Sequence, residues 1–433
     1  MTPRNDDRCS LISRRQFLVG LGATVLTAAC TSKTITVFEQ TSSTTTGLAG
    51  TTSTTIPPGT FAPVERTLVV LELGGGNDAM SMVVPHGNSR YYDLRPSVRI
   101  DDPIDLDGEI GLHPNLGRLA ARYGAGQVAV VEGVGIHDPD LSHFSSMRRW
   151  WDGTDRPDST GWLGRYLDGS VGYEDLLAGI TVGPGPSQAM LGSGSFVVNI
   201  ADAGGLTTDI PWWIDDPDEL FAAWAGFAPV DVPLSELSAV ERAIRGTTAA
   251  RQTLDAKLSP LRRTLEAGDD GDGDADGFAK DLRVAAQLVA SDSPPKVVYV
   301  HGYGDFDTHE NQRAVHDRMM AELDAGIETF FSTLEAAGVA DRAVLMTTSE
   351  FGRRPEDNDG GTDHGTASTQ LVVGAAVNGG RYGEPPSLRR LDEDGNLIHT
   401  VDFRSTFATV LDGWLQAPHS EILRADFEVL PIF

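Results

Sequence analysis

From residue 66 onward, the sequence alternates short, almost continuous apolar runs with segments of helical periodicity, and this alternation limits the fold more than any other feature. Uninterrupted apolar runs are typical of strands buried on both faces, and helices between them form the crossovers of a parallel sheet. The pattern therefore predicts an α/β fold with a mostly parallel sheet that helices cover on both faces. Residues 234–292 depart from the alternation and predict a helical insertion on this core.

The individual elements follow from the same reading. The apolar runs predict strands at residues 66–73, 127–135, 296–302, 343–349 and 371–377. The periodic segments predict helices at residues 113–124, 142–153, 311–338 and 402–415.

Charge and cysteine content exclude several classes of function. The chain of 433 residues carries a formal net charge of −28. A surface of this charge repels the phosphates of nucleic acid, so nucleic acid is not an expected partner. The two cysteines, Cys9 and Cys30, both lie near the N-terminus. The rest of the chain therefore has neither disulfide nor thiolate chemistry.

Residues 1–30 have the layout of a twin-arginine (Tat) export signal. Arg14 and Arg15 precede an apolar run that is too short and too rich in Gly and Ala to be a good membrane span. The run ends in small residues before Cys30, as in the cleavage box of a lipoprotein, but Thr27 stands where that box usually has Leu. We expect recognition by the Tat translocase and a lipid anchor on Cys30, at the cell surface or the outer face of the cytoplasmic membrane. An ordinary signal peptide is the alternative.

Residues 31–65 are rich in Ser and Thr and contain a Pro pair. Such a segment buries too little apolar area to fold, so we expect a flexible linker between the signal and a folded domain at residues 66–433.

Four clusters of polar residues follow the apolar runs or lie in nearby loops. In open α/β sheets, sites form beyond the carboxyl ends of the strands. Asn77 and Asp78 come after the first run and a Gly-rich turn, where Asp78 is a candidate metal ligand and Asn77 a candidate substrate contact. Ser142 and His143 stand at the predicted start of a helix, where backbone N–H groups stabilise an anion or a nucleophile, so both are candidate catalytic residues.

The other two clusters combine carboxylates with imidazoles. Asp307 and His309 alternate after residues 296–302, so both side chains can point the same way. Glu350 ends the run at 343–349, and Asp363 and His364 follow it after a polar gap. These five residues are candidate metal ligands. Each cluster also has a simpler interpretation, as a polar turn or a helix cap.

Together the clusters predict a divalent metal site with two ions. Two or three imidazoles among the ligands favour Zn or Mn, while Mg or Ca remains open. Arg353 and Arg354 are candidate substrate contacts, because guanidinium groups match phosphate and sulfate geometry. Ordinary salt bridges are the alternative for both.

Several longer motifs carry a resemblance to a known family of Tat-exported bacterial proteins, named "domain of unknown function" or sulfatase-like. They are LVVLELGGGNDAMSMVVP, YYDLRPS, GLHPNLGRL, SHFSSM, DFDTHENQ, SEFGRRPEDNDGGTDHGTAS and DFRSTFATVLDGWL. That family in turn resembles a distant branch of the alkaline-phosphatase-like superfamily. The resemblance implies a three-layer α/β/α sandwich with a two-metal site, and a hydrolase of phosphate or sulfate esters acting on a small anionic or glycan-linked substrate.

The sequence departs from the superfamily pattern at points that matter for chemistry. Phe351 stands where the related motif T-S-D-H-G has a metal-binding His, and His364 is the candidate replacement. A formylglycine made from cysteine is excluded in the body of the chain. A non-catalytic sulfatase-like protein for surface binding or assembly is therefore the alternative to a hydrolase.

Overall fold

The structure is a computed structural model of the whole chain. It describes residues 35–38, 56–200 with gaps at 58, 63, 156–157 and 173–174, parts of 223–249, and 277–433. The export signal predicted at residues 1–30, with the predicted lipid anchor Cys30, lies outside the described residues. Among the described helices, none is both long enough and apolar enough to cross a membrane.

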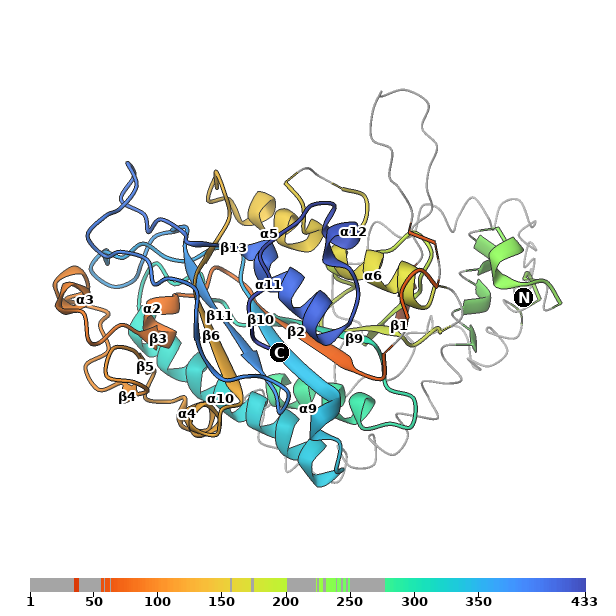
Figure 1. Cartoon of the computed structure of the whole chain (residues 1–433), viewed down its shortest axis with the longest axis horizontal. Helices are drawn as coiled ribbons and strands as arrows, with labels where there is room; N and C mark the ends of the chain where they lie inside the picture. Colours follow the sequence, from red (N-terminus) through yellow and green to blue (C-terminus); the bar gives the residue numbers. More distant parts are fainter. Residues whose placement is uncertain are drawn as a thin grey trace, which may run out of the picture.

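A ten-stranded sheet forms the centre of the molecule (Figure 1). Its strand order is β1-β8-β7-β9-β2-β10-β11-β6-β12, and β13 also pairs with β6. Neighbouring strands are parallel except at the pairs β1–β8, β10–β11 and β11–β6. Its strands are β1 (Ile35–Phe38), β2 (Thr67–Leu73), β6 (Val128–Gly135), β7 (Gly179–Val182), β8 (Val197–Ile200), β9 (Val297–Tyr303), β10 (Ala343–Thr348), β11 (Ser368–Val373), β12 (Gly380–Tyr382) and β13 (Val401–Asp402).

Helices cover both faces of this sheet, as the sequence predicts. Side chains of β2 alternate between the faces: Val69 and Leu71 join one apolar core, and Leu68 and Val70 join the other. The first core includes α4 (Gly117–Gly124), α9 (Gly277–Val289) and α10 (Gln312–Ala336). The second includes α5 (His143–Asp152), α6 (Trp162–Ser170), α11 (Phe403–Thr409) and α12 (His419–Leu423). The prediction of a three-layer α/β/α sandwich is confirmed.

A small second sheet lies at one end of the molecule, beside β6 and β11 (Figure 1). It has the strand order β3-β5-β4, and two short helices accompany it. These elements are α2 (Ala79–Met82), β3 (Val83–Val84), α3 (Ser89–Leu94), β4 (Ile104–Asp105) and β5 (Gly111–Leu112).

The structure describes parts of two further predicted segments. Within the linker predicted at residues 31–65, β1 pairs antiparallel with β8, and the side chain of Phe61 is buried against α6. In the insertion predicted at 234–292, α9 packs along α10 and contributes to the first core, while residues 250–276 lie outside the described residues.

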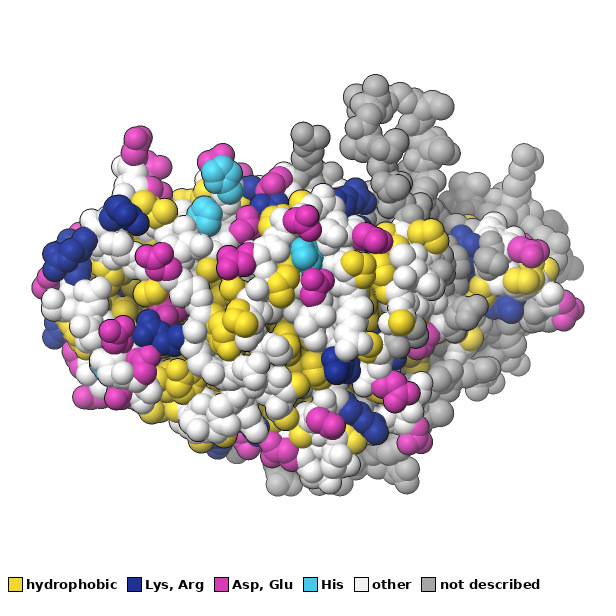
Figure 2. Space-filling view, in the orientation of Figure 1, with side chains coloured by type: hydrophobic (Ala, Val, Ile, Leu, Met, Phe, Trp, Pro, Cys, Tyr) yellow, Lys and Arg dark blue, Asp and Glu magenta, His cyan; other side chains and the backbone are white. Residues whose placement is uncertain are grey.

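The topology brings five chain segments to one edge of the sheet. β9, β2 and β10 are parallel neighbours, so their carboxyl ends lie together. Because β11 is antiparallel to β10, its amino end lies at this edge, and so does the carboxyl end of β6. The loops at residues 74–78, 136–142, 304–311 and 349–367 therefore meet here. On the face drawn in Figure 2, acidic side chains are spread over the surface, in keeping with the net charge of −28.

Candidate metal centre

A glycine turn after β2 lets two loops approach each other closely. Gly75 has φ +106°, and a Cβ atom at this position would lie 2.6 Å from the backbone nitrogen of Asp307. A side chain there would both strain the backbone and displace the Asp307 loop. The glycine at this turn therefore allows the Asp307 loop to pack directly against the loop that follows β2.

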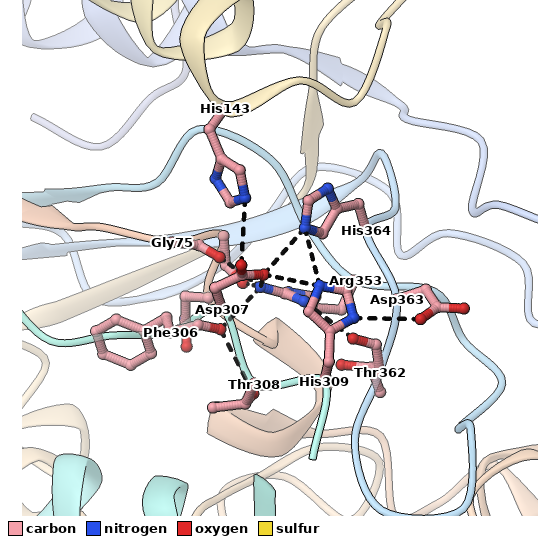
Figure 3. Close-up of polar contacts among 12 residues, drawn as sticks. Gly75, His143, Phe306, Asp307, Thr308, His309, Arg353, Thr362, Asp363 and His364 are labelled. Atoms are coloured by element: carbon pink, nitrogen blue, oxygen red, sulfur yellow. Dashed lines mark hydrogen bonds and ion pairs between the residues drawn. The ribbon is translucent and has the colours of Figure 1, made fainter.

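Three imidazoles face the carboxylate of Asp307 (Figure 3). Its Oδ1 lies 2.9 Å from Nε2 of His364 and 3.0 Å from Nε2 of His309. Its Oδ2 lies 3.4 Å from Nε2 of His143. The two nitrogens of His309 and His364 are themselves 3.2 Å apart. One oxygen pair and three ring nitrogens thus converge from α5, the loop after β9 and the loop before β11.

The second nitrogen of each imidazole lies near an oxygen acceptor. Nδ1 of His143 lies 3.0 Å from Oε1 of Glu350, and Nδ1 of His309 lies 3.3 Å from Oδ1 of Asp363. Nδ1 of His364 lies 2.9 Å from the carbonyl oxygen of Leu141. Carbonyl and ionised carboxylate oxygens only accept, so a neutral ring that donates from Nδ1 to this acceptor has Nε2 as the nitrogen that can bind an ion. Metal-binding histidines are oriented in this way.

Asp307 also has a buried arginine as a partner. Arg353 donates from Nη2 to Oδ1 of Asp307 at 2.7 Å. Burial alone would raise the pKa of Asp307, but the hydrogen bonds from Arg353 and His364 lower this pKa to about 2. The carboxylate is therefore ionised at neutral pH, and the Nε2 atoms of three imidazoles face it. A carboxylate oxygen and imidazole nitrogens are ligands that a divalent cation accepts.

Ligand atoms of His143, Asp307 and His364 all lie within 4.8 Å of one another. Among the described residues, this is one group that meets the geometric requirement for a metal site. His309 adds a fourth donor next to His364, on a side chain that is 43% exposed. The residues present therefore fit a divalent ion, with imidazole and carboxylate ligands of the kind that Zn and Mn accept.

Asp78 occupies a different environment from the one predicted for it. The carboxylate is buried and forms a two-pronged ion pair with Arg95, in which Nη2 lies 2.9 Å from Oδ1. Ser81 and Gln312 also donate to its Oδ2, each at 2.6 Å. These donors satisfy the charge of Asp78, so the structure brings it to a salt bridge and not to the imidazole cluster.

Arg353, predicted as a substrate contact, instead holds the loops of the centre together. Its guanidinium is fully buried and donates to the carbonyl oxygens of Gly76 at 2.6 Å, Thr362 at 2.9 Å and Phe306 at 2.9 Å, as well as to Asp307. A substrate anion does not reach it. Arg354 is half-buried, and no described residue accepts a hydrogen bond from its Nε.

The remaining predicted residues surround the cluster or lie beside it. Glu350 is buried and accepts from the backbone nitrogen of Gly75 at 2.8 Å as well as from His143, so it positions that imidazole. Asp363 accepts from His309. The backbone of Asn77 donates to Ser349 at 2.8 Å, and its Oδ1 is buried without a described partner.

Ser142 precedes α5 directly but does not cap the helix with its side chain. No described residue forms a hydrogen bond with its hydroxyl. Phe351 is buried, with its ring centroid 4.9 Å from that of His143 and 4.6 Å from that of His364. His364 therefore lies against the aromatic ring that replaces the expected histidine.

Two residues of the centre carry no obvious sequence signal. Leu141 adopts a left-handed conformation with φ +57°, which is strained for a bulky residue, and its carbonyl accepts from His364. Gln312 accepts from Thr362 at 2.7 Å and Thr308 at 3.2 Å while it donates to Asp78. It thereby links the buried salt bridge to both ligand-bearing loops.

Comparison with known proteins places part of the chain in a family context. Residues 232–413 match a family described as "Protein of unknown function (DUF1501)". This match confirms the resemblance read from the motifs over that segment, which includes Asp307, Glu350 and His364. No curated protein matches the sequence.

Solved structures that match this chain do so at low sequence identity and low TM-score. A protein in the alkaline phosphatase superfamily from Vibrio parahaemolyticus has 9% identity and a TM-score of 0.34, over 82% of this chain and 67% of its own. The alkaline phosphatase of the Antarctic bacterium TAB5 has 9% identity and a TM-score of 0.33, over 73% and 92%. Ps i-CgsB, solved with k-i-k-neocarrahexaose, has 9% identity and a TM-score of 0.34, over 84% and 73%. Likenesses of this size assign no activity to this chain.

Proposed function

We propose that the chain is an exported, lipid-anchored, metal-dependent hydrolase of phosphate or sulfate esters. The observation that carries the proposal is the convergence of three Nε2 atoms on the ionised carboxylate of Asp307. The expected substrate is a small anionic ester or a glycan-linked ester. Zn or Mn is the favoured metal, since imidazoles dominate the donor set. The export and anchoring parts rest on Arg14, Arg15 and Cys30 alone.

The side chains at the site have different roles. His143, Asp307 and His364 hold the ion, and His309 is placed to complete the set. A bound divalent ion supplies a Lewis acid that lowers the pKa of water or of a hydroxyl group and stabilises an anionic ester group. A second ion, as the sequence predicts, would require donors beyond this set.

Glu350 and Leu141 keep the imidazoles in the tautomer that the site needs. The carboxylate of Glu350 accepts the Nδ1 proton of His143, and the carbonyl of Leu141 accepts that of His364. The Nε2 lone pair of each ring is then available to the ion. Ser142 is the candidate nucleophile, because its hydroxyl does not cap α5 and stands one residue before His143. The N–H groups of the first turn of α5 favour negative charge at this position.

Metal content and hydrolysis measured together test the proposal. The full-length chain should retain a stoichiometric divalent ion after gel filtration and should hydrolyse an aryl phosphate or an aryl sulfate, with activity lost on chelation and restored by Zn or Mn. His364→Ala should lose both metal and turnover. His419→Ala is the matched control, because the half-buried His419 also pairs with a carboxylate, Asp412, and neither residue belongs to the cluster around Asp307. Failure to retain any divalent ion would overturn the proposal.

A second candidate function is metal-dependent binding or assembly at the cell surface without turnover. Burial of Arg353 favours it, because this predicted anion contact uses its donors on the protein. Under this alternative the chain binds a metal ion tightly, and Ser142→Ala has no effect on any measured property. Turnover of either ester that depends on Ser142 excludes the alternative.

A further inference from the structure

A hollow of about 580 Å³ lies between the small sheet and the β6–β11 end of the large sheet. It is formed where α2, β3 and β5 lie beside β6 and β11 (Figure 1). Small-molecule sites usually measure about 300–1,000 Å³, so this volume is that of a ligand site. None of the metal-centre side chains lines it, so the hollow is separate from the site described above.

One wall of the hollow is acidic. Arg381 lies among three carboxylates: its guanidinium is 2.8 Å from Oε2 of Glu132, 3.0 Å from Oδ2 of Asp107 and 3.2 Å from Oε2 of Glu109. Three negative charges thus surround one positive charge. The net charge of this wall favours a cationic ligand over an anionic one.

Two buried polar side chains on this wall have unused hydrogen-bonding capacity. Glu132 and Ser368 both line the hollow, and each is only 6% exposed. Both bonds from Arg381 to Glu132 end on Oε2, and no described residue donates to Oε1. Oγ of Ser368 is buried and has no described partner. An unmet buried polar group such as this hydroxyl is costly, so a ligand that donates to it gains affinity.

The raised pKa of Glu132 also indicates that its carboxylate lacks sufficient positive charge nearby. Burial raises the pKa of Glu132, and the neighbouring carboxylates Asp107 and Glu109 raise it further, against the opposing effect of Arg381. The single guanidinium therefore does not fully compensate the buried carboxylate.

The opposite wall of the hollow is apolar and stiff. Met80, Leu388 and Leu397 line it and belong to one apolar cluster. Pro385 and Pro386 add a rigid rim, since proline has a fixed φ. Such a surface accommodates a hydrocarbon or aromatic body.

We propose that this hollow is a binding site for a small organic cation with an apolar body. A primary ammonium group donates to Oε1 of Glu132 and to Oγ of Ser368. The apolar body lies along Met80, Leu388 and Leu397. The site does not depend on the metal centre or on hydrolysis.

Calorimetric titration with three probes of one shape tests the ligand chemistry. Phenethylamine carries the cation, 2-phenylethanol is its neutral counterpart and phenylacetate is its anionic counterpart. At pH 7, the full-length chain should bind phenethylamine at least 10-fold more tightly than either of the others, which corresponds to about 1.4 kcal/mol. Equal or tighter binding of 2-phenylethanol or phenylacetate would overturn the proposal.

Two variants locate the binding. Glu132→Gln should weaken phenethylamine binding at least 10-fold, whereas Glu421→Gln, at an exposed carboxylate on α12, should leave it unchanged. Thr369→Trp fills the hollow from its half-exposed rim without altering any charge, and it should abolish binding. If Glu132→Gln does not fold, Thr369→Trp decides: phenethylamine binding that survives in this variant contradicts the site.

Discussion

Asp78 and Asp307 make an informative pair, because the sequence predicts both as metal ligands and the structure gives them opposite surroundings. Asp78 is buried and receives hydrogen bonds from Arg95, Gln312 and Ser81. Asp307 is 34% exposed, and apart from Arg353 the groups around it are imidazole nitrogens. Asp78 is thus enclosed by donor side chains, whereas Asp307 has one arginine partner and is exposed enough to be reached from solvent.

The contrast shows which of the two carboxylates is available to a metal ion in this fold. Both have a pKa of about 2, and for both burial opposes the lowering, but for Asp78 the charge of Arg95 overcomes it and for Asp307 the hydrogen bonds from Arg353 and His364 do. The pKa therefore does not distinguish the two carboxylates. Their exposure and the side chains around them do. Gln312 joins the two regions, since it contacts Asp78 and both ligand loops.

The largest expected effect lies at the buried salt bridge. Asp78→Ala leaves the guanidinium of Arg95 buried without its carboxylate partner, and such a change costs about 3–5 kcal/mol of unfolding free energy. Urea denaturation of the metal-free protein measures it. Asp93→Ala, at an exposed carboxylate near Arg90, is the control and should cost less than about 1 kcal/mol. A loss for Asp78→Ala no larger than the control would mean that Asp78 is not structural.

The second effect concerns the acid stability of the same region. His316 is buried, and burial lowers its pKa from 6.5 to about 4, with further lowering by His113, Arg95 and Arg353 and an opposing effect of Asp78. The unfolded chain binds this proton below pH 6.5, while the folded chain binds it only below about pH 4. Stability should therefore fall as pH drops from 7 to 4, by about 3 kcal/mol for this group. His316→Leu should flatten that part of the profile. An unchanged slope in the variant would contradict the assignment.

The third effect belongs to the metal centre. His364→Ala removes one Nε2 donor and should weaken zinc binding about 100-fold, or about 2.7 kcal/mol, while unfolding of the metal-free protein changes little because the ring is partly exposed. Competition with a chromogenic chelator measures the affinity. His86→Ala, at a surface histidine paired with Asp105, is the control. Equal zinc affinity in the two variants would remove His364 from the site.

The smallest effect tests the orientation of the imidazoles. Glu350→Gln keeps an oxygen near Nδ1 of His143 but removes its charge, so zinc affinity should fall about 10-fold. The same chelator competition detects this change, with Glu393→Gln at an exposed loop position as the control. If Glu350→Gln binds zinc as the wild type does, Glu350 does not position His143.

The sequence predicts the sheet well because its strands are buried on both faces. β2, β9 and β10 each read as almost continuous apolar runs, and the structure places them side by side. Asp307 and His364 are predictable for the same reason, since they flank strands that meet at one edge. The prediction for Asp78 fails in its environment because its partners, Arg95 and Gln312, are 17 and 234 residues away along the chain.

Other parts of the centre leave no sequence signal at all. Leu141 acts through its backbone carbonyl, which every residue has, and its left-handed conformation appears only in three dimensions. Arg353 looks like an anion contact in the sequence, yet tertiary packing surrounds it with carbonyl oxygens. Residue type thus predicts which side chains could bind a metal ion or an anion. Packing decides which of these side chains remain free to do so.

X-ray absorption at the zinc edge of the zinc-loaded protein tests the central claim most directly. Convergence of His143, His364 and Asp307 predicts a first shell at roughly 2.0–2.1 Å that contains two or three nitrogens with imidazole multiple scattering and at least one oxygen. His364→Ala should lose one of these imidazoles. A shell made of oxygen atoms alone, without imidazole scattering, would contradict a metal centre at this edge of the sheet.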